Sequence, residues 1–273
     1  MTESARVSAL WQYPLKSAAG MSMAALPIAL SGPPHDRRWM LIDDDGRFLT
    51  GRTLPALVGL RAQVDQRGLR LSIPERGELA LDIPAADAER VEATVWKDTV
   101  RAQRVDRTAD AWLSRALGRS VRLVYIDDAA LRTVDPAYAR PGDRVGFADG
   151  YPLLALSEAA LDALNARLAR GGRAPVSMLR FRPNVVVAGC DAHAEDGWRR
   201  VRIGDVEFEA AKPCTRCVFT TVDPDTGERD ADGEPLRTLT TYRRTPAGVT
   251  FGMNLIPRGT GTLRIGDAVV PLD

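Results

Sequence analysis

Hydrophobic and polar positions alternate over short stretches through most of the chain, which is the pattern of half-buried β-strands. Glycine, proline and aspartate separate these stretches, and the run from Asp43 to Gly46 is typical of a hairpin loop. In the first hundred residues the predicted strands are Val7–Tyr13, Met21–Ile28, Arg38–Ile42, Arg47–Thr50, Leu57–Val64, Leu69–Ile73, Leu79–Ile83, Val91–Trp96 and Val100–Arg104. That density of strands predicts a barrel or a sandwich.

Two segments instead carry apolar residues at helical spacing. Thr108–Leu117 has an apolar stripe and is followed by Gly118, and Glu158–Leu168 follows Ser157, whose hydroxyl can cap the helix. Later strands are predicted at Val185–Ala188, Val201–Ala210, Val218–Val222, Val249–Leu255 and Thr262–Val270. We therefore expect a mainly β fold with a few helices packed on it, in the α+β class.

Composition excludes several classes of partner. The 273 residues include 37 basic and 36 acidic side chains, so no overall charge favours nucleic acid or an anionic membrane. The N-terminus has no cationic start and no apolar core of a signal peptide, and we expect a cytoplasmic protein without a membrane anchor. Three cysteines are too few, and odd in number, for a secreted disulfide scaffold.

Two of these cysteines, Cys214 and Cys217, are separated by two residues, and the pair has three interpretations: a redox dithiol, half of a zinc site, or a turn with buried thiols. Zinc needs four ligands, and Cys190 with His193 could supply the second pair. A thioredoxin-like dithiol should open a helix, whereas the β-branched run Val218–Val222 predicts a strand. The pattern therefore argues against a redox dithiol.

Lys212 and Arg216 flank the first of these cysteines, and a nearby cation lowers the pKa of a thiol and raises its thiolate fraction. One thiolate is too few ligands for a bare zinc ion. It is sufficient for a metal that arrives with other ligands of its own, and soft thiolates suit sulfur-rich centres. The pair therefore points to a cofactor more than to a bare ion.

Basic residues recur where predicted strands begin or end. Lys16 and Ser17 close the first strand, Arg37 and Arg38 precede the third, and Arg182 precedes the run of valines. A lysine beside a hydroxyl supplies the charge and the donor that a phosphate site needs, and an arginine offers a planar fork of donors. The alternatives are a solvated surface pair at the first position, ion pairs with the aspartates of the hairpin loop at the second, and a side chain lying along the neighbouring phenylalanine at the third.

Four short motifs, taken in order, resemble the MOSC-domain proteins: Tyr13–Ser17, Phe181–Asn184, Cys214–Cys217 and Thr221–Gly227. The likeness is greatest to the mitochondrial amidoxime-reducing components and their bacterial relatives, and it covers nearly the whole chain. It implies an N-terminal MOSC β-barrel domain at residues 1–120 and a C-terminal MOSC β-barrel domain at residues 121–273. Some bacterial relatives add a ferredoxin domain and the mitochondrial proteins add a membrane segment; we expect neither in this chain.

The resemblance also implies a site for the molybdenum cofactor, Mo-molybdopterin. In the family the second cysteine of the motif is the metal ligand and catalytic centre, which is Cys217 here. The other residues implied to bind the cofactor are Lys16, Ser17, Arg37, Gly150, Tyr151, Arg182, Asn184, Thr215, Arg216 and the neighbourhood of Asn254. Arg38 stands where relatives often carry an aromatic residue, which is a departure from the pattern.

The reaction implied is a two-electron reduction of a small N-hydroxylated compound. The sequence has no flavin fingerprint, haem signature or iron–sulfur spacing of cysteines, so the electrons are expected from a separate ferredoxin-, flavoprotein- or cytochrome-type protein. Two other functions stay open at this point. The chain could carry molybdenum cofactor or sulfur without turnover, since MOSC domains also occur in cofactor sulfurases, or it could be a structural zinc module.

Overall fold

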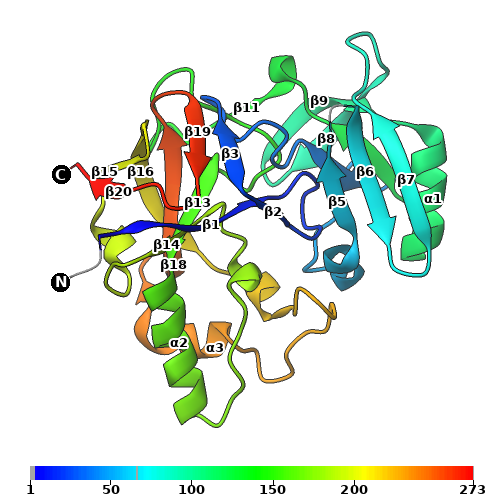
Figure 1. The fold of residues 1–273 in the computed structure, drawn as a ribbon. Helices are drawn as coiled ribbons and strands as arrows, with labels where there is room; N and C mark the ends of the chain where they lie inside the picture. The colour runs from blue at the N-terminus through cyan, green and yellow to red at the C-terminus, as the bar shows by residue number, and fades with distance from the viewer. Residues whose placement is uncertain (1–3, 66, 273) are drawn as a thin grey trace.

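The computed structural model describes residues 4–65 and 67–272, and its strands form two lobes that lie side by side (Figure 1). The first lobe contains β1 (Arg6–Gln12), β2 (Met21–Met23), β13 (Leu153–Ser157), β14 (Val185–Ala188), β15 (Arg200–Ile203), β16 (Val206–Thr215), β17 (Arg244–Thr245), β18 (Gly248–Pro257) and β20 (Val269–Pro271). The second contains β4 (Trp39–Ile42), β5 (Arg61–Val64), β6 (Gly68–Ile73), β7 (Gly77–Asp82), β8 (Arg90–Val95), β9 (Asp98–Arg104) and β10 (Arg122–Tyr125). Two short ladders are made by β3 (Ala25–Ile28) with β19 (Gly261–Arg264) and by β11 (Arg132–Thr133) with β12 (Arg144–Val145). The mainly β prediction is confirmed.

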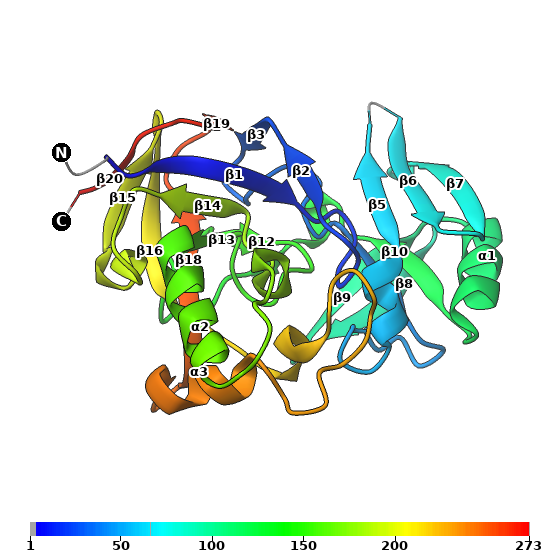
Figure 2. The same cartoon turned by 60° about the horizontal axis from the view of Figure 1, so that its bottom comes forward.

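The nine-stranded sheet of the first lobe runs β2-β1-β14-β13-β18-β16-β15-β20, with β17 paired to β18. Its centre is apolar on both faces: Val185, Val186 and Val187 of β14 are buried, and β14 runs parallel to β13. Continuous apolar runs are typical of such doubly covered strands. On the other side β14 pairs antiparallel with β1, so the first strand of the chain lies inside the sheet built mainly from its second half (Figure 2).

The second lobe holds a four-stranded sheet, β4-β10-β9-β8, and a three-stranded sheet, β5-β6-β7. β10 follows residue 120 and yet pairs with β4 and β9, whereas β1 and β2 belong to the other lobe. The strand pairings therefore do not follow one cut in the chain. The boundary at residue 120 stays a prediction.

Both predicted helices are present. α1 (Arg107–Leu117) begins at Asp106, whose carboxylate accepts the backbone N–H of Ala109 at 2.8 Å, and it ends at Gly118 with a φ of 65°. α2 (Glu158–Arg170) is two residues longer than predicted. The predicted cap at Ser157 is wrong, because its hydroxyl makes no hydrogen bond to the helix. A third helix is α3 (Leu236–Tyr242).

Short 3-10 helices replace two predicted strand segments. Pro55 opens η1 (Pro55–Gly59) where the strand Leu57–Val64 was expected, and only its second half forms β5. The run Val218–Val222 forms η5 (Val218–Thr221), because the hydroxyls of Thr220 and Thr221 donate to carbonyl oxygens three residues earlier, at 3.0 and 2.7 Å. The other 3-10 helices are η2 (Asp128–Ala130), η3 (Met178–Phe181) and η4 (Ala194–Gly197).

Four further strand predictions need correction. Met21–Ile28 is divided between β2 and β3, which belong to different sheets. Within Arg47–Thr50, Arg47 and Phe48 make only isolated bridges to neighbouring strands. The predicted strand Val201–Ala210 is a hairpin of β15 and β16, since Gly204 turns the chain with a φ of 56°. Thr262–Val270 is likewise divided between β19 and β20.

The carboxyl group of Glu195 is buried next to β13. The Glu195 side chain is fully buried, with one oxygen accepting the backbone N–H of Ser157 at 3.3 Å and the other without a partner among the described residues. Burial raises the pKa of this carboxyl, which means that the folded state binds the proton more tightly than the unfolded chain does.

Stability should therefore fall as pH rises from about 4.3, the ordinary glutamate value, toward the raised pKa of Glu195 in the folded state. In Glu195→Gln this loss should be absent, because the amide does not ionise. Urea unfolding at pH 5 and pH 8 measures it, with exposed Glu92→Gln as the matched control. Equal pH dependence in wild type and Glu195→Gln would contradict the assignment.

Candidate functional site

One cavity, lined by segments of both lobes, brings together every residue that the sequence analysis assigned to a site. These are Lys16, Ser17, Arg37, Gly150, Tyr151, Arg182, Asn184, Thr215, Arg216, Cys217 and Asn254. They come from six separate parts of the chain. Their convergence is a property of the fold, since no two of the motifs are adjacent in sequence.

The two cysteines of the motif occupy different surroundings. Both are free thiols, but Cys217 is exposed at the start of η5, whereas Cys214 is partly covered at the end of β16. Burial raises the pKa of the Cys214 thiol by more than the Arg216 guanidinium lowers it. The expected activation of that thiol by neighbouring cations is therefore wrong; Lys212 instead lies over the ring of Tyr138, at 4.9 Å.

Arg216 holds the cysteine loop in place. Its backbone N–H donates to the carbonyl oxygen of Val249 at 2.7 Å, and its guanidinium donates to the carbonyl oxygens of Phe251, at 2.5 and 2.8 Å, and Phe181, at 3.0 Å. These bonds tie the loop to β18 and to η3. The side chain predicted to contact the cofactor is thus already engaged with backbone.

Asn184 is the centre of a buried hydrogen-bond network. Its amide nitrogen donates to the Trp11 carbonyl oxygen and the Asp36 carboxylate, both at 3.1 Å. Its amide oxygen accepts from Arg37, at 3.0 Å, and from the backbone N–H of Leu154, at 3.2 Å. All four hydrogen-bonding positions of this side chain are filled by the protein. It is fully buried and cross-links three segments beneath the cavity.

Arg37 and Arg182 lie on the ring of Tyr13, with guanidinium carbons 4.3 and 4.2 Å from its centroid. Asp36 neutralises Arg37 at 2.5 Å, while Arg182 donates to the Ala18 carbonyl oxygen at 2.6 Å. Burial, with help from the Arg37 charge, lowers the pKa of Arg182 to about 10, and burial raises that of Tyr13 to about 12. Two cations are held close together by an aromatic ring and one carboxylate.

Neither arginine of the Arg37–Arg38 pair bonds to the hairpin aspartates, so that alternative is wrong. Arg38 points away from the cavity and bonds to Asp128 at 2.7 Å and to the carbonyl oxygen of Ile126 at 3.0 Å. The departure from the family pattern at this position therefore lies outside the cavity lining.

Lys16 also lines the cavity. Its ammonium donates to the Phe147 carbonyl oxygen at 2.7 Å and to Asp149 at 2.6 Å, and Asp149 also accepts the indole N–H of Trp96 at 3.1 Å. Burial lowers the pKa of Lys16, and the Asp149 charge opposes this. The Asp149 carboxylate reaches solvent on one side, and although desolvation raises its pKa, Lys16, Trp96 and Arg52 hold it well below its usual range.

Three other predicted residues, Ser17, Gly150 and Asn254, also line the cavity. Ser17 is buried and has a φ of 68°, and the Asn254 amide donates to the Lys212 carbonyl oxygen at 3.1 Å. A Cβ on Gly150 would meet no atom within 4 Å, so nothing in the protein requires glycine there.

Several polar atoms on the cavity lining lack a partner. Among the residues that the structure describes, these buried atoms are Arg180 Nε, Arg182 Nη2 and Tyr151 Oη. A buried donor without an acceptor costs about 1–3 kcal/mol, which a bound ligand can recover. The described lining contains one acidic residue, Asp149, and six basic residues: Lys16, Arg37, Arg52, Arg180, Arg182 and Arg216. The donor set fits an anionic ligand.

Sequence reasoning missed Arg180, Arg52, Trp96 and Asp149. Arg180 is two residues before Arg182, and its position next to a predicted motif was a usable signal. It bonds to Asp223 at 2.9 Å. The others reach the site only through the tertiary fold, and the sequence offered no such signal for them.

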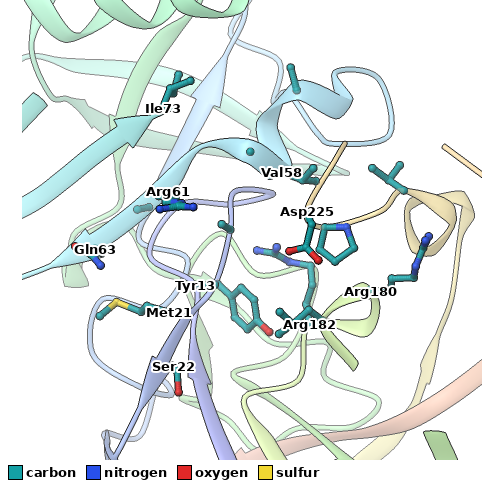
Figure 3. A pocket seen from close by; sticks show the side chains of 18 of the residues that line it. Tyr13, Met21, Ser22, Val58, Arg61, Gln63, Ile73, Arg180, Arg182 and Asp225 are labelled. Atoms are coloured by element: carbon teal, nitrogen blue, oxygen red, sulfur yellow. The ribbon is translucent and has the colours of Figure 1, made fainter. Parts of the chain in front are cut away.

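A second cavity of about 660 Å³ adjoins the first and shares Arg180, Arg182 and Phe219 with it (Figure 3). In the close view the Arg182 side chain lies beside the ring of Tyr13, with Val58 on the opposite wall. Arg182 is thus part of the partition between the two spaces.

The zinc interpretation is not supported by the arrangement of side chains. Within the described residues, no three His, Cys, Asp or Glu side chains gather closely enough to hold a metal ion. Cys190 packs against the core of the first lobe, and the His193 ring lies against Tyr242 and Phe251, with 6.0 and 5.7 Å between ring centroids.

Among residues 4–65 and 67–272, no helix is long and apolar enough to cross a membrane.

Comparison with known proteins identifies the family. The model of the MOSC N-terminal beta barrel domain matches residues 4–120, and that of the MOSC domain matches residues 142–270. Mitochondrial amidoxime-reducing component 1 of Mus musculus is 36% identical over 96% of this chain and 81% of its own length. The molybdenum cofactor sulfurase of Solanum lycopersicum is 30% identical over 95% of this chain and 35% of its own length.

Among solved structures, the YUAD protein of Bacillus subtilis aligns over 97% of this chain and 94% of its own, with 11% identity and a TM-score of 0.41. The sequence comparisons are much stronger than this one. On the two domain matches and the 36% identity along nearly its whole length, the chain belongs to the MOSC-domain proteins, in the family of the mitochondrial amidoxime-reducing components.

Proposed function

We propose that the protein is a molybdenum-cofactor-dependent oxidoreductase that reduces N-hydroxylated compounds with electrons from a separate redox protein. The observation that carries the proposal is one cavity with an exposed thiol, Cys217, and unpartnered donors on Arg180, Arg182 and Tyr151. A thiolate ligand together with fixed donors for an anionic group is what a phosphorylated pterin with a metal-binding sulfur pair requires.

The residues divide into those that would touch the cofactor and those that position others. Cys217 would be the metal ligand through Sγ, because its thiol is exposed to the cavity whereas that of Cys214 is partly covered. The free donors of Arg182, Arg180 and Tyr151 would meet the anionic and polar parts of the cofactor. When bound, the molybdenum centre would supply the two-electron chemistry that removes oxygen from nitrogen.

The remaining predicted residues act mainly through their neighbours. Asn184 fixes Arg37 through Asp36, and Arg216 fixes the cysteine loop through backbone carbonyls. Lys16 is neutralised by Asp149 and also donates to the carbonyl oxygen of Phe147, which leaves one donor position of its ammonium near the cavity. Ser17, Gly150, Thr215 and Asn254 stay proposed as cofactor contacts because they line the same space.

Each turnover would consume two electrons and two protons and release one water molecule for each N–OH group reduced to N–H. The protein would therefore need an electron donor, of ferredoxin, flavoprotein or cytochrome type, for every cycle. A second function, carriage of molybdenum cofactor or sulfur without turnover, is favoured by the 30% identity to a molybdenum cofactor sulfurase, of which this chain covers 35%.

Protein made in a cofactor-competent host should contain molybdenum and pterin in a ratio near one per chain. Cys217→Ser should lose the molybdenum, because a hydroxyl is a far poorer ligand for it than a thiolate, and Cys214→Ser, the matched control, should keep it. Elemental analysis measures both. Stoichiometric zinc, or molybdenum that survives in Cys217→Ser, would falsify the proposal.

Turnover separates the reductase from the carrier. With benzamidoxime and a chemically reduced artificial donor, the molybdenum-loaded protein should form benzamidine, measured by chromatography, and Cys217→Ser should form none. A carrier would contain molybdenum and yet produce no benzamidine, which is the result that favours the second function.

The role of Asn184 can be tested without the cofactor. Asn184→Ala removes four buried hydrogen bonds and should lower the free energy of unfolding of cofactor-free protein by roughly 2–5 kcal/mol. Asn254→Ala removes one and should cost about 1 kcal/mol. Unchanged stability in Asn184→Ala, with loss of molybdenum alone, would instead make Asn184 a direct cofactor contact.

A further inference from the structure

Arg52 differs from the other five basic residues that line the cavity. Each of those donates to a carboxylate or a backbone carbonyl, as Arg180 does to Asp223 and Lys16 to Asp149. The Arg52 guanidinium donates to no residue in the described ranges 4–65 and 67–272, and no carboxylate there lies within salt-bridge distance of it. It rests instead over the ring of Trp96, 4.2 Å from the centroid. All its donors are free for a ligand.

Trp96, whose ring lies against that guanidinium, has an unusual backbone conformation. It is the first residue of the two-residue turn between β8 and β9, where Val95 pairs with Asp98, and its φ is 55°. Such turns need a positive φ at this position, which favours glycine and is a clear outlier for a large aromatic residue. The indole is nevertheless fixed, by Phe48 at 4.9 Å between ring centroids and by the hydrogen bond to Asp149.

This strained residue is also exposed: 42% of its surface reaches solvent. A bulky, exposed side chain in a glycine position stabilises the fold poorly, so its presence points to a use of the ring. Among the described residues, the cation that lies over this ring is Arg52. The arrangement places one guanidinium, which donates to no described residue, beside this exposed ring, with its charge also acting on Asp149.

The Arg52 turn lies directly against the helix that follows the metal-ligand cysteine. A Cβ added to Gly51 would stand 2.2 Å from the Phe219 ring, so the backbone at Gly51 and the ring on η5 are in close contact. Arg52 and Cys217 line the same cavity. A ligand bound beside Cys217 therefore shares its cavity with the Arg52 guanidinium.

We propose that Arg52, supported by the ring of Trp96, determines substrate specificity by binding a carboxylate carried by the N-hydroxylated compound. The proposal rests on the proposed function and names the substrate class of the same site: N-hydroxylated molecules that also carry an anionic group. Arg182, Arg180 and Tyr151 keep the deeper, buried free donors, and these suit the anionic part of the cofactor. Arg52 serves the group that arrives with the substrate.

The test compares neutral benzamidoxime with benzamidoximes that carry a ring carboxylate at the meta or para position. In Arg52→Gln the KM for the better carboxylated compound should rise about tenfold or more, the loss expected for one charge-assisted hydrogen bond, with kcat changed little. The KM for benzamidoxime should change less than about threefold, and molybdenum content should equal that of wild type. The matched control is Arg202→Gln, which removes the same charge from an exposed position on β15 and should change neither KM.

Three results would overturn the proposal: equal KM changes for the neutral and carboxylated compounds, no change for either, or loss of molybdenum from Arg52→Gln, which would make Arg52 a cofactor ligand. If wild type reduces none of the compounds, the proposed function fails separately. Calorimetric titration of the molybdenum-loaded protein with meta- and para-amidinobenzoate then still tests Arg52. Tighter binding of either compound by wild type than by Arg52→Gln would support the role of Arg52. Equal binding by the two proteins would contradict it.

Two variants of Trp96 separate positioning from structure. Trp96→Gly relieves the strained φ, so its unfolding temperature should equal or exceed that of wild type, while its KM for the carboxylated compound rises as in Arg52→Gln. Trp96→Phe keeps a ring beneath the guanidinium and loses only the bond to Asp149, and its KM should stay near wild type. A destabilised Trp96→Gly with unchanged KM would show that the ring has only a structural role.

Discussion

The site depends on one constraint: several guanidinium groups, some of them buried, must be kept close together around one cavity. The network of Asp36, Asn184 and Arg37 meets it, since the carboxylate neutralises one arginine and the amide fills all its hydrogen-bonding positions while joining β1, β13 and the turn at Asp36 and Arg37. A buried ion pair is stable only when its remaining donors and acceptors are also satisfied. This one is, so the strands of the first lobe and the turn before β4 are fixed relative to one another.

That arrangement gives the cations of the cavity different roles. Lys16, Arg37 and Arg180 each have a carboxylate within 2.9 Å that neutralises them, whereas Arg216 is fixed by backbone carbonyls and keeps its charge. Arg182, Arg216 and Arg52 have no carboxylate bonded to them within the described residues and keep their positive charge. A cavity organised in this way can hold one anionic group among its buried donors and a second beside Arg52.

Much of this site follows from the sequence. The motifs at Tyr13–Ser17, Phe181–Asn184 and Cys214–Cys217 mark the residues that the fold brings to one cavity, because each stands at the end of a strand or in the turn beside it, where side chains are free to converge. What each residue does there depends on contacts that sequence spacing does not contain. Asn184 is a structural link and Arg216 a backbone clamp, and Arg52 enters the site only because a turn packs against η5. The β-branched run after Cys217 misled the prediction because threonine hydroxyls bonded to the backbone favour a 3-10 turn.

Backbone strain gives independent support for where the function lies. In the described part of the chain seven residues other than glycine have a positive φ, and three of them, Ser17, Arg37 and Arg182, line the cavity, while a fourth, Trp96, contacts it through Arg52 and Asp149. Each such conformation costs on the order of 1 kcal/mol or more and is retained only where the surrounding contacts impose it. At Arg37 and Arg182 the positive φ directs both guanidinium groups onto the ring of Tyr13, and these contacts offset its cost. Trp96 has the same backbone feature and the same kind of cation partner on the outside of the cavity. An aromatic ring that carries a guanidinium therefore occurs twice at this cavity, at Tyr13 and at Trp96.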